Sequence, residues 1–206
     1  MSAGDGVGFV GHVFRRDIVK KVKKRVHCLS ILKVAVEIYV GLWYIGKSKH
    51  QQKRGIGVYN VLDIANWFLN RDRMTSELED SDGISNLKLQ KLLYYAQGIS
   101  LAEKGTPLFA DNLLAWTHGP VVERAYHAYK QYGSNPIPFD EPFDDSMIAP
   151  EDKEMLEAVY QYFSQYSAWK LREMTHQEAP WKNTQLSTAI SEDLIKDYFK
   201  REIIDV

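Results

Sequence analysis

Residues 87–98 read LKLQKLLYYAQG, and this stretch is the centre of the fold expected from the sequence. Its apolar residues recur three and four positions apart, which predicts a helix with one inner face. That inner face consists of Leu89, Leu92, Leu93, Ala96 and Ile99. Ser85 is suited to cap the start of this helix, and Lys104 followed by Gly105 is typical of a helix end. We refer to residues 87–98 as the signature segment.

Similar patterns predict further helices on both sides of the signature segment. Asn60 is a suitable cap for a helix whose buried stripe begins at Val61. Residues 113–117 are expected to form a brief extended segment, and Pro120 is expected to begin a helix that runs to Tyr132. Other helix starts are expected at Pro150, Ser167 and Ser191. The fold class predicted is therefore mainly α, a compact multi-helix domain with at most a short β segment.

Charge divides the chain into two parts. Residues 1–57 carry 12 Lys and Arg against 3 Asp and Glu, whereas residues 58–206 carry 14 against 24. The net charges are therefore +9 and −10, which predicts a basic N-terminal extension followed by a separate folded domain. Because phosphate contacts need a basic footprint, no specific nucleic-acid binding is expected of residues 58–206.

The chain is expected to act in the cytoplasm. Cys28 is its one cysteine, which excludes an internal disulfide framework and fits a reducing compartment. The apolar run at residues 26–46 is interrupted by Lys33 and Glu37, whereas a spanning helix needs about 20 mostly apolar residues. No membrane partner is therefore expected.

No motif for catalysis, metal binding or cofactor binding is found. Thr175 and His176 are adjacent, so on a helix their side chains diverge and cannot form a nucleophile–base pair. His118 and His127 do not form a metal-binding pair at helical spacing, and His127 is expected to be exposed. His118 and His176 are expected to hydrogen-bond the backbone at tight corners. The chain is therefore expected to be no enzyme and to hold no cofactor or metal.

Two further patches place aromatic residues beside Gly or Pro. Residues 115–122 read AWTHGPVV and residues 175–181 read THQEAPW. Such neighbours favour close packing, so structural roles are expected for Trp116, Gly119, Pro120, Tyr126, His176, Pro180 and Trp181. If Trp116 is buried, Trp116→Ala should cost about 3–5 kcal/mol.

These patches, in this order, resemble the Panacea-domain antitoxins, also described as SocA-like or phage-associated GepA-like proteins. The resemblance covers about residues 58–200 and includes the signature segment, residues 115–122 and residues 175–181. It implies a helical antitoxin that neutralises a cognate toxin by direct protein–protein binding in a bacterial or prophage toxin–antitoxin system. A proteolytic adaptor that delivers its toxin to an ATP-dependent protease is an alternative, and a small hydrolase is another.

Residues 1–57 lie outside the pattern of this family, which begins near Tyr59. Val58 can be encoded by GTG, a codon that can start bacterial translation. The extension is therefore interpreted as a product of start-site choice, and the domain should fold and neutralise its toxin without it.

The signature segment is also the candidate partner-binding face. Its members are Lys88, Lys91, Tyr94, Tyr95 and Gln97, which combine aromatic and polar groups as interface hot spots do. The alternative is that both tyrosines pack against the Trp116 corner while the lysines are solvated. In either case, changing both lysines to Glu should leave folding nearly untouched. The net charge of −10 favours a partner with a basic surface.

Overall fold

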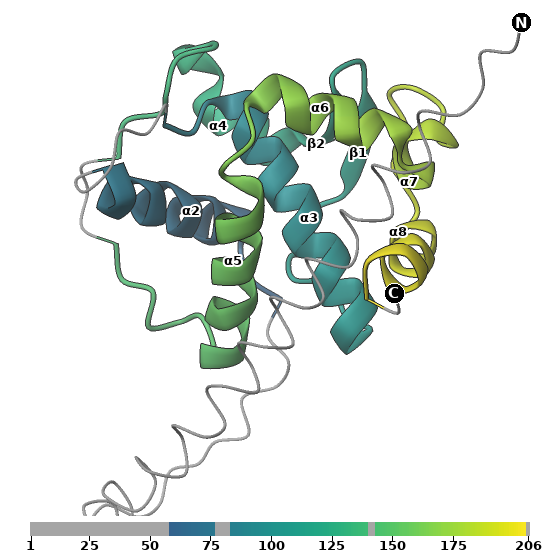
Figure 1. The fold of residues 1–206 in the computed structure, drawn as a ribbon, viewed down its shortest axis with the longest axis horizontal. Helices are drawn as coiled ribbons and strands as arrows, with labels where there is room; N and C mark the ends of the chain where they lie inside the picture. The colour runs from purple at the N-terminus through teal and green to yellow at the C-terminus, as the bar shows by residue number, and fades with distance from the viewer. Residues whose placement is uncertain (1–57, 77–82, 140–142, 205–206) are drawn as a thin grey trace, which may run out of the picture. The chain divides into compact units, whose positions relative to one another are not determined.

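The computed structural model describes residues 58–76, 83–139 and 143–204, and the predicted basic extension lies outside these ranges (Figure 1). Within them the elements follow the order α2 (Val61–Ser76), α3 (Asn86–Lys104), β1 (Leu113–Trp116), β2 (Gly119–Val122), α4 (Glu123–Tyr129), the 3-10 turn η2 (Lys130–Tyr132), α5 (Pro150–Phe163), α6 (Ala168–Gln177), α7 (Ala179–Lys182), α8 (Glu192–Phe199) and the π-helical turn η3 (Lys200–Ile204). The predicted mainly α class with one short β segment is confirmed.

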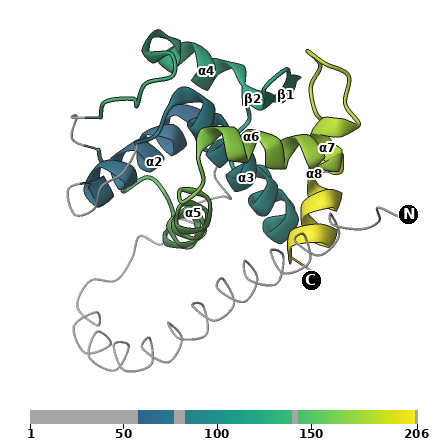
Figure 2. The same ribbon diagram turned by 45° about the horizontal axis from the view of Figure 1, so that its top comes forward.

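Helix α3 occupies the middle of the described domain. It runs between α2 and α5 on one side and α8 on the other, and α6 also packs on it (Figure 1, Figure 2). From Asn86 to Leu101 every residue except Leu87 is buried or nearly so. A helix enclosed on all sides has no face left for solvent, so its polar residues must find partners inside the protein.

Both ends of α3 are formed as the sequence predicts. The Ser85 side chain accepts a hydrogen bond from the backbone N–H of Lys88, which satisfies a free donor of the first turn. Gly105 follows the last turn in the left-handed conformation, with φ of 72°, and donates its N–H to the carbonyl of Leu101. The predicted inner face is buried throughout.

Aromatic rings close the core around the middle of α3. Tyr95 stacks on Phe163 of α5 with ring centroids 3.7 Å apart, and Tyr94 meets Phe199 of α8 edge-on at 5.3 Å. Gly98 is required here, because a Cβ atom on it would lie 2.4 Å from the Phe199 ring. Helix α8 can therefore approach α3 closely only where α3 has no side chain.

A two-stranded antiparallel hairpin follows α3. Leu113 of β1 pairs with Val122 of β2, and Trp116 pairs with Gly119 across the turn. The predicted extended segment is thus confirmed, but the helix expected to start at Pro120 is wrong, because α4 begins only at Glu123. A proline fits this strand since its missing N–H would face away from β1 and no ladder bond is lost.

Both outer edges of the hairpin are covered. On the β1 edge, the backbone of Ala115 exchanges hydrogen bonds with Ser187 and Thr188, at 2.7 and 2.9 Å. On the β2 edge, the Gln90 side chain accepts from the N–H of Val122 at 2.9 Å. A side chain of α3 therefore satisfies a backbone N–H group that a third strand would otherwise bind.

The remaining helix starts agree with the sequence. Pro150 begins α5, and the Ser167 side chain accepts from the N–H of Lys170 at the start of α6. Helix α8 begins directly after Ser191. Within the described ranges no helix combines the length and apolar character needed to cross a membrane.

Candidate functional site

The five residues predicted as a partner-binding face do not form a surface. Lys88 is 7% exposed, and Lys91, Tyr94, Tyr95 and Gln97 are less exposed still. The alternative of solvated lysines is wrong for the same reason: α3 is enclosed by helices and the hairpin. The tyrosines do pack, but on Phe163 and Phe199 rather than at the Trp116 corner.

Lys91 is a buried amine with one hydrogen-bond acceptor, the carbonyl of Pro120, at 2.9 Å. The pKa of Lys91 is lowered from 10.5 to about 7, mainly by burial and also by the charge of Arg172, while the charge of Glu178 opposes the shift. Changing this residue to Glu would place a carboxylate against a carbonyl without solvent. The expectation that the double lysine substitution leaves folding untouched is therefore wrong.

Glu178, at the junction of α6 and α7, binds both tyrosines of the signature segment. The Tyr94 hydroxyl donates to one carboxylate oxygen at 2.7 Å and the Tyr95 hydroxyl to the other at 2.9 Å. Burial raises the pKa of both hydroxyls well above 10, and the charge of Glu178 raises it further. The tyrosines therefore stay protonated and tie α3 to the α6–α7 corner.

The amides of α3 hold neighbouring backbone in the same way. The Gln97 oxygen accepts from the N–H groups of Leu108 and Phe109, at 2.8 and 3.2 Å, and its nitrogen donates to the Phe109 carbonyl. Gln90 donates to Asn86, which donates to the carbonyl of Tyr126. The polar half of α3 is thus a scaffold that positions the loop before β1, the strand β2 and helix α4.

The predicted structural residues meet at the turn of the hairpin. Gly119 has φ of 98°, and a Cβ atom on it would lie 2.7 Å from both the Lys91 amine and the Thr175 hydroxyl. The Trp181 indole donates to the carbonyl of Trp116 at 2.9 Å, and its ring stacks on His176 at 3.7 Å. This corner joins the hairpin to α6 and α7, and Pro180 is buried behind it.

Two histidines, His118 and His176, differ from what was expected of them. The Nε2 atom of His176 is buried and has no hydrogen-bond partner among the described residues. Burial lowers the pKa of His176, and the charges of Arg172, Lys91 and His118 lower it further. His118 is exposed and accepts a hydrogen bond from a side chain rather than binding backbone. His127 is exposed, as predicted.

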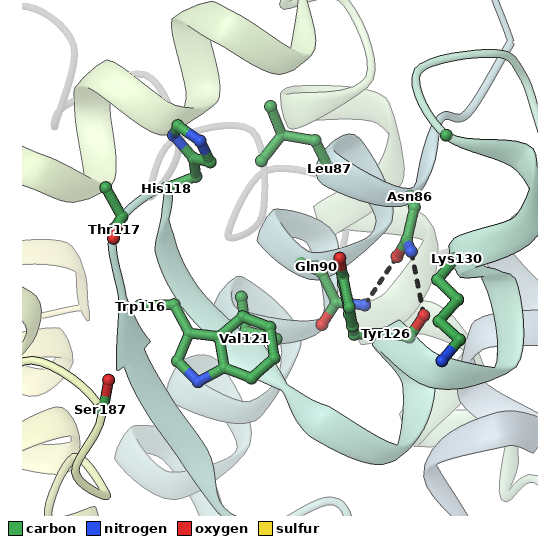
Figure 3. A pocket seen from close by; sticks show the side chains of 11 residues that line it. Asn86, Leu87, Gln90, Trp116, Thr117, His118, Val121, Tyr126, Lys130 and Ser187 are labelled. Atoms are coloured by element: carbon green, nitrogen blue, oxygen red, sulfur yellow. Dashed lines mark hydrogen bonds between the residues drawn. The ribbon is translucent and has the colours of Figure 1, made fainter.

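A groove of about 590 Å³ opens beside the hairpin, between α3 and α4 (Figure 3). Its aromatic wall consists of Trp116 and Tyr126, whose rings meet edge-on at 5.0 Å. Asn86 and Gln90 contribute amides, and Figure 3 shows them joined by a hydrogen bond. Trp116 is only half-buried in this position, so the cost of Trp116→Ala should fall below that of a fully buried Trp.

Basic groups lie on opposite sides of this lining. Lys130 and His118 both line the groove, and Figure 3 shows them well apart. Arg172 donates from Nε to the His118 Nδ1 atom at 3.3 Å and lies over the Trp169 ring at 4.6 Å. Trp169 is 55% exposed, although it is large and apolar. We refer to Trp169, Arg172 and His118 as the rim.

Sequence reasoning missed Asn86, Lys130, Trp169 and Arg172 at this site. The last two carried a detectable signal, because a Trp and an Arg three positions apart lie on one helix face. In the parts of the chain that the structure describes, no group of three His, Cys, Asp or Glu side chains is placed to hold a metal ion. The arrangement offers aromatic surface, cations and amides, which suit binding.

Comparison with known proteins identifies relatives of one kind. The family model described as "Antitoxin SocA-like, Panacea domain" matches residues 89–182. "Antitoxin SocA" of Caulobacter vibrioides (strain NA1000 / CB15N) is 30% identical in an alignment of 143 residues, and the match covers 60% of this chain and 76% of that protein. No solved structure matches the chain. The matched family region begins in α3 and ends in α7, so it includes most of the groove lining, the rim and the Glu178 corner.

Proposed function

The chain belongs to the SocA-like Panacea-domain family, and on that premise we propose that it is an antitoxin that neutralises a cognate toxin by direct protein–protein binding. The observation that carries the proposal is the likeness to an antitoxin over 76% of that protein's length. The matched region includes the whole groove lining except Asn86, Leu87 and Ser187. The toxin is the partner, and no nucleic acid or membrane is required.

Direct binding, rather than catalysis, is supported by where the reactive groups lie. Lys91 has a pKa near 7, as an amine nucleophile needs, but it is fully buried and its amine is held by a backbone carbonyl. Glu178, the acid whose charge acts on Lys91, is also buried and accepts from two tyrosines. A substrate would have to open the core to reach either group.

We propose residues 58–206 as the unit that acts, in the cytoplasm. Tyr59, next to the start of α2, donates to Asp152 of α5 at 2.9 Å, so a side-chain hydrogen bond ties the first described residues to the rest of the domain. The single cysteine of the chain suits a reducing compartment. The domain presents a preorganised surface, which lowers the entropic cost of binding a partner.

The test is rescue by co-expression. The protein encoded by the adjacent reading frame is expressed from an inducible promoter, alone and together with residues 1–206. We expect growth arrest by that protein alone, growth when both are present, and co-purification of the two at stable abundance. Lack of toxicity or lack of rescue would contradict an antitoxin function. Rescue accompanied by loss of the toxin from cells would contradict neutralisation by stable binding.

A further inference from the structure

The rim exposes an aromatic side chain that the fold does not need. Trp169 is 55% exposed in α6, and its ring contacts are with Arg172 at 4.6 Å and with His118, whose ring centroid is 6.3 Å away. Trp, Tyr and Arg are the residues most enriched at interface hot spots. An exposed Trp held in place by a guanidinium presents its apolar area already ordered, so little side-chain entropy remains to be lost on binding.

Within the described residues, the cations around the groove have no carboxylate partner. Among the described residues no carboxylate lies within ion-pair distance of Arg172 or Lys130, and the groove lining includes no Asp or Glu. Nearby acids have partners of their own: Glu123 faces His127, and Glu173 faces Lys170, each at 3.7 Å. Two cations, Arg172 and Lys130, therefore lie at opposite sides of the groove in a domain whose net charge is −10.

The hydrogen bond between Arg172 and His118 leaves the guanidinium able to bind an anion. His118 accepts through Nδ1, so this nitrogen carries a lone pair and no proton in this arrangement. Arg172 uses only its Nε for that contact, and its two terminal nitrogens form no other hydrogen bond with the described residues. These nitrogens form the fork that matches a carboxylate bidentately.

A partner cannot bind here by adding a β-strand to the hairpin, because both edges of the hairpin are already bonded. The outer backbone of β1 is bonded to residues 187–190, and that of β2 to the side chains of Gln90 and Lys91. A partner therefore binds through side chains that enter the groove. With a volume of about 590 Å³, it accommodates a short segment with one or two large side chains.

We propose that the groove and its rim dock a segment of the toxin in which a carboxylate lies next to an aromatic or large apolar side chain. The apolar side chain packs against the wall that the Trp116 and Tyr126 rings form together, and the carboxylate binds Arg172. That the partner is a toxin rests on the proposed function. The preference of the groove for a carboxylate beside an apolar side chain is independent of that function. A toxin with a basic surface is compatible, because the long-range field of the −10 domain steers encounter while the groove selects the local segment.

The first arm of the test uses a phage-displayed library of random short peptides, selected on the immobilised full chain. We expect enriched peptides to pair Asp or Glu with Trp, Phe, Tyr or Leu. Synthetic versions should bind more than about tenfold more weakly to Arg172→Glu and Trp169→Ala, the loss expected of hot-spot residues. Lys200→Glu, an exposed charge on η3, is the matched control and should bind them normally.

The second arm measures the affinity of the toxin for the same variants. Thermal unfolding establishes that each variant is folded, and Arg172→Gln replaces Arg172→Glu if the charge reversal impairs folding. If the wild type binds the toxin and the rim variants bind it equally well, the groove is not the docking site, and the antitoxin function stands. If the wild type does not bind the toxin, the antitoxin function fails, and the peptide arm alone decides the groove.

Three results of the peptide arm overturn the proposal. They are enrichment of no peptide, enrichment of peptides without carboxylates, and affinities that the rim variants leave unchanged. Tighter binding of a labelled mixed-sequence single-stranded RNA than of any peptide would also overturn it, since the cations would then serve phosphate. We expect no such RNA binding, because a net charge of −10 opposes it.

Discussion

Helices α3 and α6 carry the same kinds of side chain and use them in opposite ways. On α3, the Lys91 amine binds the Pro120 carbonyl, and Tyr94 donates to Glu178. On α6, Arg172 lies over an exposed Trp169 and reaches toward the groove. The polar groups of α3 are bound inside the protein, whereas those of the rim have few partners. An interface is therefore identified by side chains that the fold leaves unpaired, not by polar and aromatic composition alone.

The strongest test of this contrast is the acceptor shared by the two tyrosines. Glu178→Ala leaves the hydroxyls of Tyr94 and Tyr95 buried without an acceptor, at about 1–3 kcal/mol each, so we expect a loss of about 4 kcal/mol in the free energy of unfolding. Urea denaturation followed by circular dichroism measures it. Glu178→Gln keeps one acceptor and should lose about half as much.

The matched control for Glu178 is Glu173→Ala, since Glu173 is an exposed carboxylate of α6 that pairs only loosely with Lys170. Its substitution should change the free energy of unfolding by no more than about 0.5 kcal/mol. Equal losses in the two Ala variants would show that the buried hydrogen bonds of Glu178 contribute no more to the free energy of unfolding than the exposed Glu173 does.

The close approach of α8 to α3 gives the next largest effect. Gly98→Ala places a methyl group 2.4 Å from the Phe199 ring, and overpacking of this kind costs about 1–3 kcal/mol. Thermal unfolding should report the loss. Adding Phe199→Leu should restore part of it by making room. Absence of any rescue in the double variant would mean that the strain is not at this contact.

A third test uses pH and Lys91. In the unfolded chain this amine keeps its proton up to a pKa near 10.5, whereas in the folded chain it releases it near 7. The unfolded state therefore binds more protons in this interval, and the free energy of unfolding should rise with pH by up to about 1.4 kcal/mol per unit. Above pH 10 it should fall again, because Tyr94 and Tyr95 ionise only in the unfolded state.

Lys91→Met should abolish the rise between pH 7 and 10, and Lys170→Met, at an exposed position of α6, should keep it. Denaturant unfolding at several pH values measures the slope for each variant. If Lys91→Met leaves the slope unchanged, groups other than Lys91 cause the pH dependence. The experiment would then give no evidence that the Lys91 amine is buried in solution.

The smallest effect is expected from removing residues 1–57. Because the hydrogen bonds described for α3 and the rim join residues within 58–204, the shortened chain should differ in stability by less than about 0.5 kcal/mol and should rescue cells equally well. Purification of residues 58–206 and the co-expression assay measure both. An insoluble or inactive product would make the extension part of the functional unit.

Helix ends were predictable because their signals are local. Ser85, Gly105 and Pro150 each act within one turn of the chain, and each is placed as expected. Pro120 was misread, since a fixed φ suits both the first turn of a helix and an outward-facing strand position. The burial of Lys91 was not predictable, because its acceptor lies 29 residues away and is a backbone carbonyl. The aromatic wall of the groove could have been predicted. That Arg172 has no carboxylate partner among the described residues depends on the full set of tertiary contacts and could not.

The order in which the chain is synthesised gives the contact between Gly98 and Phe199 a further consequence. The helix that lies deepest in the domain is made about 100 residues before the ring that closes over it. At about 5–20 residues per second, α3 waits roughly 5–20 s on the ribosome for its last cover. During that time Tyr94 and Tyr95, which Phe199 covers in the finished fold, are accessible to chaperones and proteases. A prematurely terminated message would therefore yield a chain for degradation, and only completed chains would add to the pool of active protein.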